Sequence, residues 1–334
     1  MKAVRVPGPG GTLELVDVAQ PSPTARQVLI HVDACGICHS DAVTVSGGRP
    51  GMQYPRIPGH EVVGTVVEVG AEVPRWKTGE RVGIGWHGWH DGTCPTCRRG
   101  DPFACPQQQV TGLSFDGGYA QYMVAPYEGL AAVPTELSAV DAAPLLCAGV
   151  TTFNALRNCG ARPGDLVAVL GLGGLGHLAV QYAAKMGFRT VVVARGPEKS
   201  SFARQLGATA YVDSLAQNAA EELTGLGGAQ VILSTVTDAQ AIGDLIGGLS
   251  VHGTLISVGV PRDPVPVSIG SLLAGRRSVQ GWYSGVAVDS EDALRFSVQT
   301  GVRPMSEVFP LENAPAAFER MLRGTVRFRA VLQP

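Results

Sequence analysis

The sequence predicts a mixed α/β protein of two domains, one a barrel-like β domain and the other a doubly wound domain with a parallel sheet. The chain of 334 residues is too long for one ordinary domain and long enough for two domains, each with its own core. Short β-type segments broken by Gly and Pro come first, and strands that alternate with helix-length segments follow. A glycine-rich loop lies between the first strand and the first helix of the second pattern.

The β-type pattern covers residues 1 to about 148. Frequent Gly and Pro between short apolar runs are typical of a β barrel, because each strand must end in a tight turn. The runs that we expect to be strands are Gln27–Asp33, Val62–Val69, Arg81–Ile84 and Tyr119–Val124.

The alternating pattern begins with a strand over Asp165–Leu170, a helix over Leu175–Met186 and a strand over Thr190–Ala194. Further strands are expected at 210–213, 230–235 and 253–258, so this doubly wound domain covers about 149–280. The remaining residues 281–334 contain short apolar runs such as Ala330–Leu332, which we expect to complete the first domain. The β domain therefore comprises 1–148 and 281–334.

Composition limits the class of partner. With 45% hydrophobic and 16% charged residues, the chain is expected to be globular, and its net charge of -2 argues against nucleic acid as a partner. Neither a signal peptide nor an apolar run of about 18 residues is evident, so we expect a cytoplasmic protein without a membrane partner. A small neutral molecule fits this composition better.

The loop Gly171-Leu-Gly-Gly-Leu-Gly176 has the context of a dinucleotide site, directly after a buried-type strand and before a helix. Its first glycine permits a tight turn, the second allows the backbone to approach a pyrophosphate, and the third allows the helix to pack closely on the strand. A glycine-rich turn without a ligand is the alternative. The loop residues expected to bind the cofactor are Gly171, Gly173, Gly174, Leu175 and Gly176.

Ala194 stands at the end of the second strand, where an NAD site normally has an acidic residue for the ribose hydroxyls. No carboxylate there would repel a 2′-phosphate, and the adjacent Arg195 can pair with one, which favours NADP(H) over NAD(H). Lys199 is a further cofactor-binding candidate. Alternatively, Arg195 faces solvent or stacks on the adenine of NAD.

Seven cysteines are an odd number, and three of them lie within residues 94–105, so metal binding is a better explanation than disulfides in a reducing compartment. Two other segments combine a thiol or an imidazole with carboxylates close to turn glycines: Cys35-Gly-Ile-Cys-His-Ser-Asp41 and Pro58-Gly-His-Glu61. A third, Leu145-Leu-Cys-Ala-Gly-Val-Thr151, contains one more thiol.

These three segments resemble those of the zinc-dependent medium-chain alcohol dehydrogenases, and the resemblance extends over essentially the whole chain. It implies a GroES-like β-barrel catalytic domain and a Rossmann cofactor domain. Cys38, His60 and Cys147 match the family's ligands of the catalytic zinc, whose fourth position is left for water or alcohol.

The resemblance also implies roles for the neighbours of these ligands. Asp41 matches the acidic residue that fixes the tautomer of the ligand histidine, and Glu61 is expected to approach the metal transiently. Ser40 matches the hydroxyl beside the alcohol oxygen, and His39 matches a residue that approaches the pyrophosphate. Where the family often has a relay histidine this chain has Val43, so the proton must leave through the ribose hydroxyls and water.

The substrate pocket is expected to include Trp86, at a position that lines it in relatives, and Arg49, at a position where some relatives carry a second pocket tryptophan. An indole beside the metal narrows the pocket, which favours primary alcohols and aldehydes. Ordinary core packing is the alternative for Trp86, and Arg49 leaves the size of the pocket open. Cys35 is interpreted as a small buried residue, the alternative being a redox or metal-binding pair with Cys38.

A second zinc is expected at a lobe that the family builds from four cysteines. The first position here is an aspartate, whose oxygen is an acceptable but harder ligand. An empty lobe, or His87 or His90 in place of the aspartate, are alternatives. The expected structural ligands are Asp91, Cys94, Cys97 and Cys105.

The function implied is reversible hydride transfer between an alcohol and NAD(P), in which zinc acts as a Lewis acid that lowers the pKa of the alcohol. One rival is a zinc-free quinone or enone reductase of the same superfamily, which has no use for the three ligands. Another is a non-catalytic, zinc-braced nucleotide-binding protein, against which Ser40 beside an open metal site is evidence. Relatives of this length suggest a homo-oligomer, either a tetramer or a dimer.

Overall fold

The computed structural model describes residues 1–334 and divides into two units. Unit 1 comprises Met1–Val150 and Gly285–Pro334, and unit 2 comprises Thr151–Ser284. The sequence predicted boundaries at 148 and 280. The predicted fold class is confirmed, because unit 1 is built on a sheet that is antiparallel except for one strand pair and unit 2 on a parallel one.

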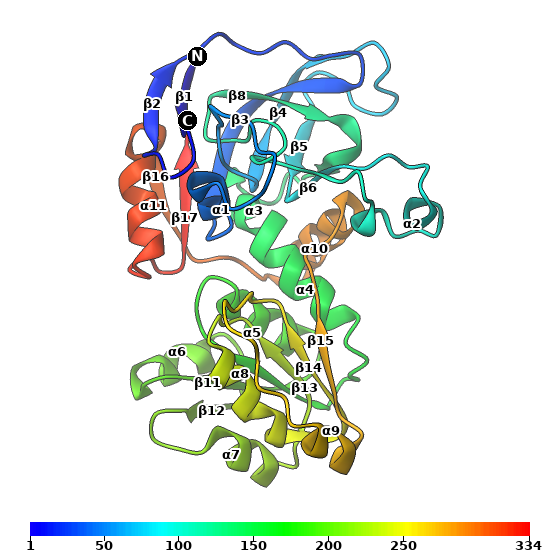
Figure 1. The fold of residues 1–334 in the computed structure, drawn as a ribbon, viewed down its shortest axis with the longest axis vertical. Coiled ribbons are helices and arrows are strands. Elements are labelled where there is room, and N and C mark those ends of the chain that lie inside the picture. The colour runs from blue at the N-terminus through cyan, green and yellow to red at the C-terminus, as the bar shows by residue number, and fades with distance from the viewer. The chain divides into compact units, whose positions relative to one another are not determined.

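Unit 1 contains a seven-stranded sheet in the order β16-β17-β3-β4-β5-β9, with β8 also paired to β3 (Figure 1). The C-terminal β17 pairs with β3, so the end of the chain completes the sheet. Val28, Ile30 and Val32 alternate along β3 and are buried in the core of the unit. The strands are β3 (Gln27–Ile37), β4 (Val62–Val69), β5 (Arg81–Ile84), β8 (Tyr122–Pro126), β9 (Leu130–Ala132), β16 (Ser306–Pro310) and β17 (Arg329–Gln333).

Two strand predictions in this sheet had wrong bounds. β3 does not end at Asp33 but continues to Ile37, through buried residues that show no alternation, and its register shifts between Val32 and Ala34. β8 covers Tyr122–Pro126 rather than Tyr119–Val124. A bulge interrupts the period-two pattern on which the sequence prediction rests, so the second half of β3 is not visible in it.

The other elements of unit 1 are short. Two further strand pairs are β1 (Lys2–Arg5) with β2 (Glu14–Asp17) and β6 (His87–Trp89) with β7 (Gln109–Val110). The helices are α1 (Asp41–Ser46), α2 (Pro95–Arg98), α3 (Ala139–Pro144), α10 (Ala287–Thr300) and α11 (Ala314–Leu322), with 3-10 turns η1 (Pro102–Ala104), η2 (Tyr127–Gly129) and η6 (Leu311–Asn313).

A continuous helical stretch, Ala139–Arg157, joins α3 to a π-helical turn η3 (Leu145–Gly149) and to α4 (Val150–Arg157). By length and composition alone this stretch could cross a membrane, but 83% of its most apolar window is buried inside the protein. A buried core helix has the same composition, so the stretch is weak evidence for a membrane span.

Unit 2 has one six-stranded sheet in the order β12-β11-β10-β13-β14-β15, in which every neighbouring pair is parallel (Figure 1). This is the doubly wound arrangement, and its strand order reverses between β10 and β13. The strands are β10 (Leu166–Leu170), β11 (Arg189–Ala194), β12 (Ala210–Asp213), β13 (Ala229–Ser234), β14 (Leu249–Ser257) and β15 (Ser278–Gly281).

The helices between these strands bury apolar residues against the sheet, whose central strand β10 is buried throughout. The predicted first helix begins at Gly176 rather than Leu175, which caps it. The helical elements are α5 (Gly176–Lys185), η4 (Pro197–Lys199), α6 (Ser200–Gln205), α7 (Ala219–Gly225), α8 (Ala239–Asp244), η5 (Leu245–Gly248) and α9 (Ile269–Gly275).

Candidate active site

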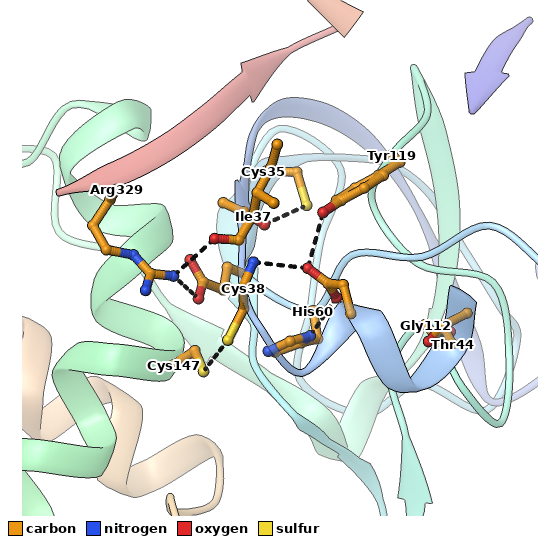
Figure 2. Close-up of polar contacts among 12 residues, drawn as sticks. Cys35, Ile37, Cys38, Thr44, His60, Gly112, Tyr119, Cys147 and Arg329 are labelled. Carbon is orange, nitrogen blue, oxygen red and sulfur yellow. Dashed lines mark hydrogen bonds and ion pairs between the residues drawn. The ribbon is translucent and has the colours of Figure 1, made fainter. Parts of the chain in front are cut away.

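Two thiols and an imidazole meet inside unit 1, from three segments that are far apart in the sequence. Cys38 follows β3, His60 precedes β4, and Cys147 lies on the π-helical turn η3. The two Sγ atoms are 3.8 Å apart, and Figure 2 shows them facing one another beside the His60 ring. One donor atom from each of Cys38, His60, Glu61 and Cys147 lies within 4.8 Å of the others. We call these four residues the Cys38 group.

The His60 ring is held in one orientation. Its Nδ1 lies 2.8 Å from Asp41 Oδ1, and the ring is fully buried. Since a carboxylate accepts, Nδ1 carries a proton, and the buried Nε2 has no hydrogen-bond partner. Burial lowers the pKa of His60, but Asp41 and Cys38 raise it, and the pKa lies well above its usual value. A buried imidazole nitrogen beside two thiols is the donor arrangement that zinc prefers, and the metal displaces any proton it carries. The residues present therefore fit a zinc ion.

The thiols differ in how easily they lose a proton. The hydrogen bond between the two thiols, together with the nearby His60, holds the pKa of Cys38 well below its usual range in spite of burial. The same hydrogen bond and burial raise the pKa of Cys147. The thiolate is the form of cysteine that binds a metal.

Asp41 is itself fixed by two donors. Its Oδ2 accepts from the backbone N–H of Cys38 at 2.9 Å and from the Tyr119 hydroxyl at 2.9 Å (Figure 2). Burial raises the pKa of Tyr119 well above its usual value, so the phenol stays a donor. Sequence reasoning missed Tyr119, because no local pattern joins it to a residue 78 positions away.

Glu61 forms a buried ion pair with Arg329 of β17, and Arg329 also donates to the carbonyl of Ile37 at 3.2 Å. Burial raises the pKa of Glu61 to about 7 even though Arg329 lowers it. Its second oxygen, Oε2, has no partner, and a Cβ on Gly36 would lie only 1.9 Å from it, so Gly36 leaves the carboxylate its space. Arg329 was not predicted from the sequence as a site residue either. Its only sign in the sequence is a single arginine beside the apolar run Ala330–Leu332.

Two other predicted residues lie next to the donors. The Trp86 indole meets the His60 ring edge to face, with 4.9 Å between centroids. Cys35 is fully buried in β3 and its thiol is 3.6 Å from the carbonyl of Gly36, outside the Cys38 group.

The remaining residues predicted for this site are more exposed. Ser40 is half-buried at the N-cap of α1, and His39 beside it is exposed. Val43 lies within α1, so no imidazole stands at that position. Arg49 is exposed in the loop after α1, and the structure gives it no contact with the donors.

A second set of donors lies on one loop of unit 1. Cys94 caps α2, and its Sγ is 3.8 Å from that of Cys105. Asp91 Oδ1 accepts from the backbone N–H groups of Cys94 (2.8 Å) and Thr93 (2.7 Å), which hold the pKa of the carboxyl well below its usual range. The donor atoms lie within 4.8 Å of one another and belong to Asp91, Cys94, Cys97 and Cys105, which we call the Asp91 group.

The two histidines considered as substitutes for Asp91 are outside this group. Their rings lie 5.1 Å apart, and His87 also packs against Phe103. Burial lowers the pKa of His87 to about 4. The structure brings Asp91, and neither His87 nor His90, to the three thiols.

The glycine loop of unit 2 connects β10 to α5. A Cβ on Gly171 would lie 2.6 Å from a Val236 methyl group, and one on Gly176 would lie 2.1 Å from the carbonyl of Gly171. A Cβ on Gly173 would have no neighbour within 4 Å, so two glycines are required for packing and the third leaves open space on its Cα side for a ligand. His177, which the sequence reasoning missed, fixes this turn because its Nδ1 donates to Gly173 O at 3.0 Å.

Gly174 and Leu175 complete the turn into α5, with Leu175 as the N-cap. At the neighbouring strand, Ala194 is the buried last residue of β11 and Arg195 after it is exposed. Lys199 ends η4 and is half-buried. The end of β11 therefore presents a guanidinium rather than a carboxylate.

Two family models match the chain. Residues 24–135 match the alcohol dehydrogenase GroES-like domain, and residues 174–299 match the zinc-binding dehydrogenase domain. The first match contains the segments of Cys38 and His60 and the whole Asp91 group, and the second begins within the glycine loop.

Curated proteins and solved structures are similar to the whole chain. The alcohol dehydrogenase notN of an Aspergillus species is 45% identical over 97% of this chain and 95% of its own length. The cinnamyl alcohol dehydrogenase of Sorghum bicolor superposes with a TM-score of 0.90 at 31% identity, over 99% of this chain and 97% of its own. An NAD-dependent alcohol dehydrogenase superposes with a TM-score of 0.92 at 27% identity, over 100% of both chains.

Proposed function

Since the chain belongs to the zinc-type medium-chain alcohol dehydrogenases and is thus an alcohol oxidoreductase that uses a nicotinamide cofactor, we propose which metal, cofactor and alcohol it uses. The reaction is reversible hydride transfer between a primary alcohol and NADP(H), giving the aldehyde. Unit 1 is the catalytic unit and unit 2 the cofactor-binding unit.

Cys38, His60 and Cys147 hold the catalytic zinc. The observation that carries this assignment is the buried, partnerless Nε2 of His60, which faces two thiols 3.8 Å apart. A zinc-free reductase of the same fold has no reason to leave that nitrogen unpaired, because a buried polar atom without a partner is destabilising. When bound, zinc supplies Lewis-acid polarisation of the alcohol oxygen, and the nicotinamide ring supplies the hydride acceptor.

The residues around these ligands orient them. Asp41 keeps the proton of His60 on Nδ1, so that Nε2 remains a lone-pair donor. Tyr119 keeps Asp41 in place. Glu61, with one oxygen unpaired and the other held by Arg329, is placed to approach the metal transiently.

Ser40 takes the proton of the alcohol as its first relay, because its hydroxyl can donate and accept in the same step. Val43 cannot carry a proton, so this chain offers no side chain at that position for a second relay. Trp86, packed against His60, narrows the space beside the metal and favours slender primary alcohols. We place Arg49 at the rim of this pocket.

The NADP(H) preference is supported by what stands at the end of β11. A carboxylate at position 194 would repel the 2′-phosphate, and Ala194 carries none. Arg195 and Lys199 supply positive charge close by. The open space at Gly173, at the N-terminus of α5, is where the pyrophosphate would be bound.

The Asp91 group holds a second zinc, which braces its loop and takes no part in the chemistry. Three thiols and one carboxylate oxygen make a closed four-donor set, which is typical of a structural site.

The protein is proposed to be a cytoplasmic homo-oligomer. β15 is an edge strand with every residue exposed, including the apolar Val279. An uncovered strand edge is a template for pairing with a second copy. Cysteines that bind zinc must stay reduced, which favours a reducing compartment.

One preparation tests these assignments. Zinc per chain is measured by atomic emission, and initial rates are measured for a panel of alcohols and aldehydes with NADP(H) and NAD(H). We expect zinc in both groups, loss of activity on complete chelation and higher kcat/KM with NADP(H). Activity that survives with less than one zinc per chain would overturn the metal assignment.

The cofactor preference has its own variant. Ala194→Asp should weaken NADPH binding much more than NADH binding, because it introduces a carboxylate where the 2′-phosphate is proposed to lie. Equal loss with both cofactors would remove the support for the NADP(H) preference.

A further inference from the structure

The loop that carries Arg195 is fixed by two side chains of the neighbouring strand. Tyr211 and Asp213 are two residues apart on β12 and thus lie on the same face of the sheet. The Tyr211 hydroxyl donates to the carbonyl of Gly196 at 2.5 Å, and the N–H of Gly196 donates to Asp213 Oδ1 at 2.8 Å. Both backbone polar groups of Gly196 are therefore bound by β12.

Residues other than glycine are disfavoured at position 196. Its φ of 80° lies in the region that favours glycine, and an added Cβ would lie 2.2 Å from Glu198 Oε2. Arg195 immediately precedes this residue, at the end of β11, and its side chain is exposed. The direction of the Arg195 side chain thus depends on a turn that Tyr211 and Asp213 hold in place.

The Asp213 carboxylate accepts hydrogen bonds from the backbone. The same Oδ1 also accepts from the N–H of Leu215 at 3.0 Å, and Asp213 is in register with Ala194 on β11. An acidic side chain does lie near the end of β11, but it binds two backbone N–H groups that offset its charge. Burial raises the pKa of Tyr211, as do Asp213 and Glu198, so the phenol remains protonated and donates.

We propose that Tyr211 and Asp213 are positioning residues for cofactor selectivity, which hold the Gly196 turn so that Arg195 binds the 2′-phosphate of NADP(H). The inference rests on the proposed NADP(H) preference and adds the residues that create it. NADH lacks the 2′-phosphate, so loosening the turn should affect NADPH binding alone.

The test is a double-mutant cycle on the full-length protein, with the Kd of NADPH and of NADH measured by calorimetry. Tyr211→Phe removes one hydrogen bond and should weaken NADPH binding about fivefold, with NADH changed by less than about twofold. In an Arg195→Ala background, Tyr211→Phe should change NADPH binding by less than about twofold, because its effect passes through Arg195. Tyr122→Phe on β8, in unit 1, is the matched control and should change neither.

Asp213 is tested by two substitutions. Asp213→Ala should lower NADPH affinity about as much as Tyr211→Phe, whereas Asp213→Asn keeps an oxygen acceptor and should stay within about twofold of the wild type. Tighter NADPH binding by Asp213→Asn would mean that the carboxylate repels the phosphate, which would overturn its positioning role. The unfolding temperature of each variant shows whether it is still folded. If Asp213→Ala is unfolded, the NADPH affinity of Asp213→Asn is the result that decides the role of Asp213.

The double-mutant cycle tests the NADP(H) preference and the positioning role of Tyr211 and Asp213 separately. If Arg195→Ala leaves the ratio of the NADPH and NADH constants unchanged, the NADP(H) preference is wrong and the inference falls with it. If Arg195→Ala weakens NADPH alone while Tyr211→Phe and Asp213→Ala weaken neither cofactor, only the positioning role is wrong.

Discussion

The Cys38 group takes its donors from segments up to 109 residues apart, whereas the Asp91 group takes all four from one loop. Cys38, His60 and Glu61 are buried, and their positions are fixed by a network that reaches β17 through Arg329. In the Asp91 group only Cys105 is buried, and the contacts that hold it come from its own loop.

This difference indicates that the two metal sites have different roles. A metal held by a buried, cross-linked framework keeps its ligands in one geometry, as catalysis requires. A metal held by one exposed loop mainly restricts that loop. The substitutions below are ways to break or sharpen this distinction, in order of expected effect.

The largest effect is expected for removal of a ligand from the Cys38 group. Cys147→Ala should lower kcat/KM for alcohol oxidation by at least about 1000-fold, since Lewis-acid stabilisation supplies several kcal/mol. Zinc per chain should fall by one, with the Asp91 group still loaded. Cys159→Ala, at a half-buried cysteine outside both groups, is the control and should change neither quantity. Full activity in Cys147→Ala would contradict the assignment.

A smaller effect is expected behind the ligand. Asp41→Asn leaves His60 without its charged partner and should lower activity or zinc affinity about 10- to 100-fold. Tyr119→Phe removes one of the two donors to Asp41 and should act in the same direction, but less. Metal titrations of both variants measure how much zinc affinity each has lost. A loss in Tyr119→Phe as large as that in Asp41→Asn would contradict the expected order.

The two groups also differ in how far the sequence predicts them. Three of the four donors of the Asp91 group stand out in the sequence as cysteines clustered within residues 94–105, and the structure brings all four donors together. The ligands of the Cys38 group follow only from the resemblance, and their supporting residues Tyr119 and Arg329 were missed. Local patterns hold no information on contacts 78 and 268 residues apart, which exist only once the sheet has formed. For the same reason the continuation of β3 past its bulge was not predicted, although the parallel sheet of unit 2 was.

At the Asp91 group the effect should be on stability rather than on rate. Asp91→Ala should lose the second zinc and lower the unfolding temperature by several degrees, while kcat at 25 °C stays within about twofold. Asp91→Cys supplies a fourth thiol and should retain the metal more firmly than the wild type. A loss of activity in proportion to the loss of this zinc would mean that the group is not merely a brace.

The smallest effect is expected at Cys35. Although Cys35 and Cys38 are three positions apart, Cys35 lies outside the donor group in a tightly packed part of β3. Cys35→Ala should leave zinc content and kcat unchanged and cost about 1 kcal/mol of unfolding free energy. A change in metal content would instead support the interpretation of Cys35 as a metal ligand or a redox partner of Cys38.

The central claim, that the Cys38 group holds the zinc that performs the chemistry, is tested most directly by timed chelation. Zinc content and the rate of alcohol oxidation are followed together in one sample. The account predicts that the zinc of the less buried Asp91 group leaves first with little loss of rate, and that the rate then falls in step with the second zinc. A rate that persists after both ions are removed, or that disappears with the first, would contradict it.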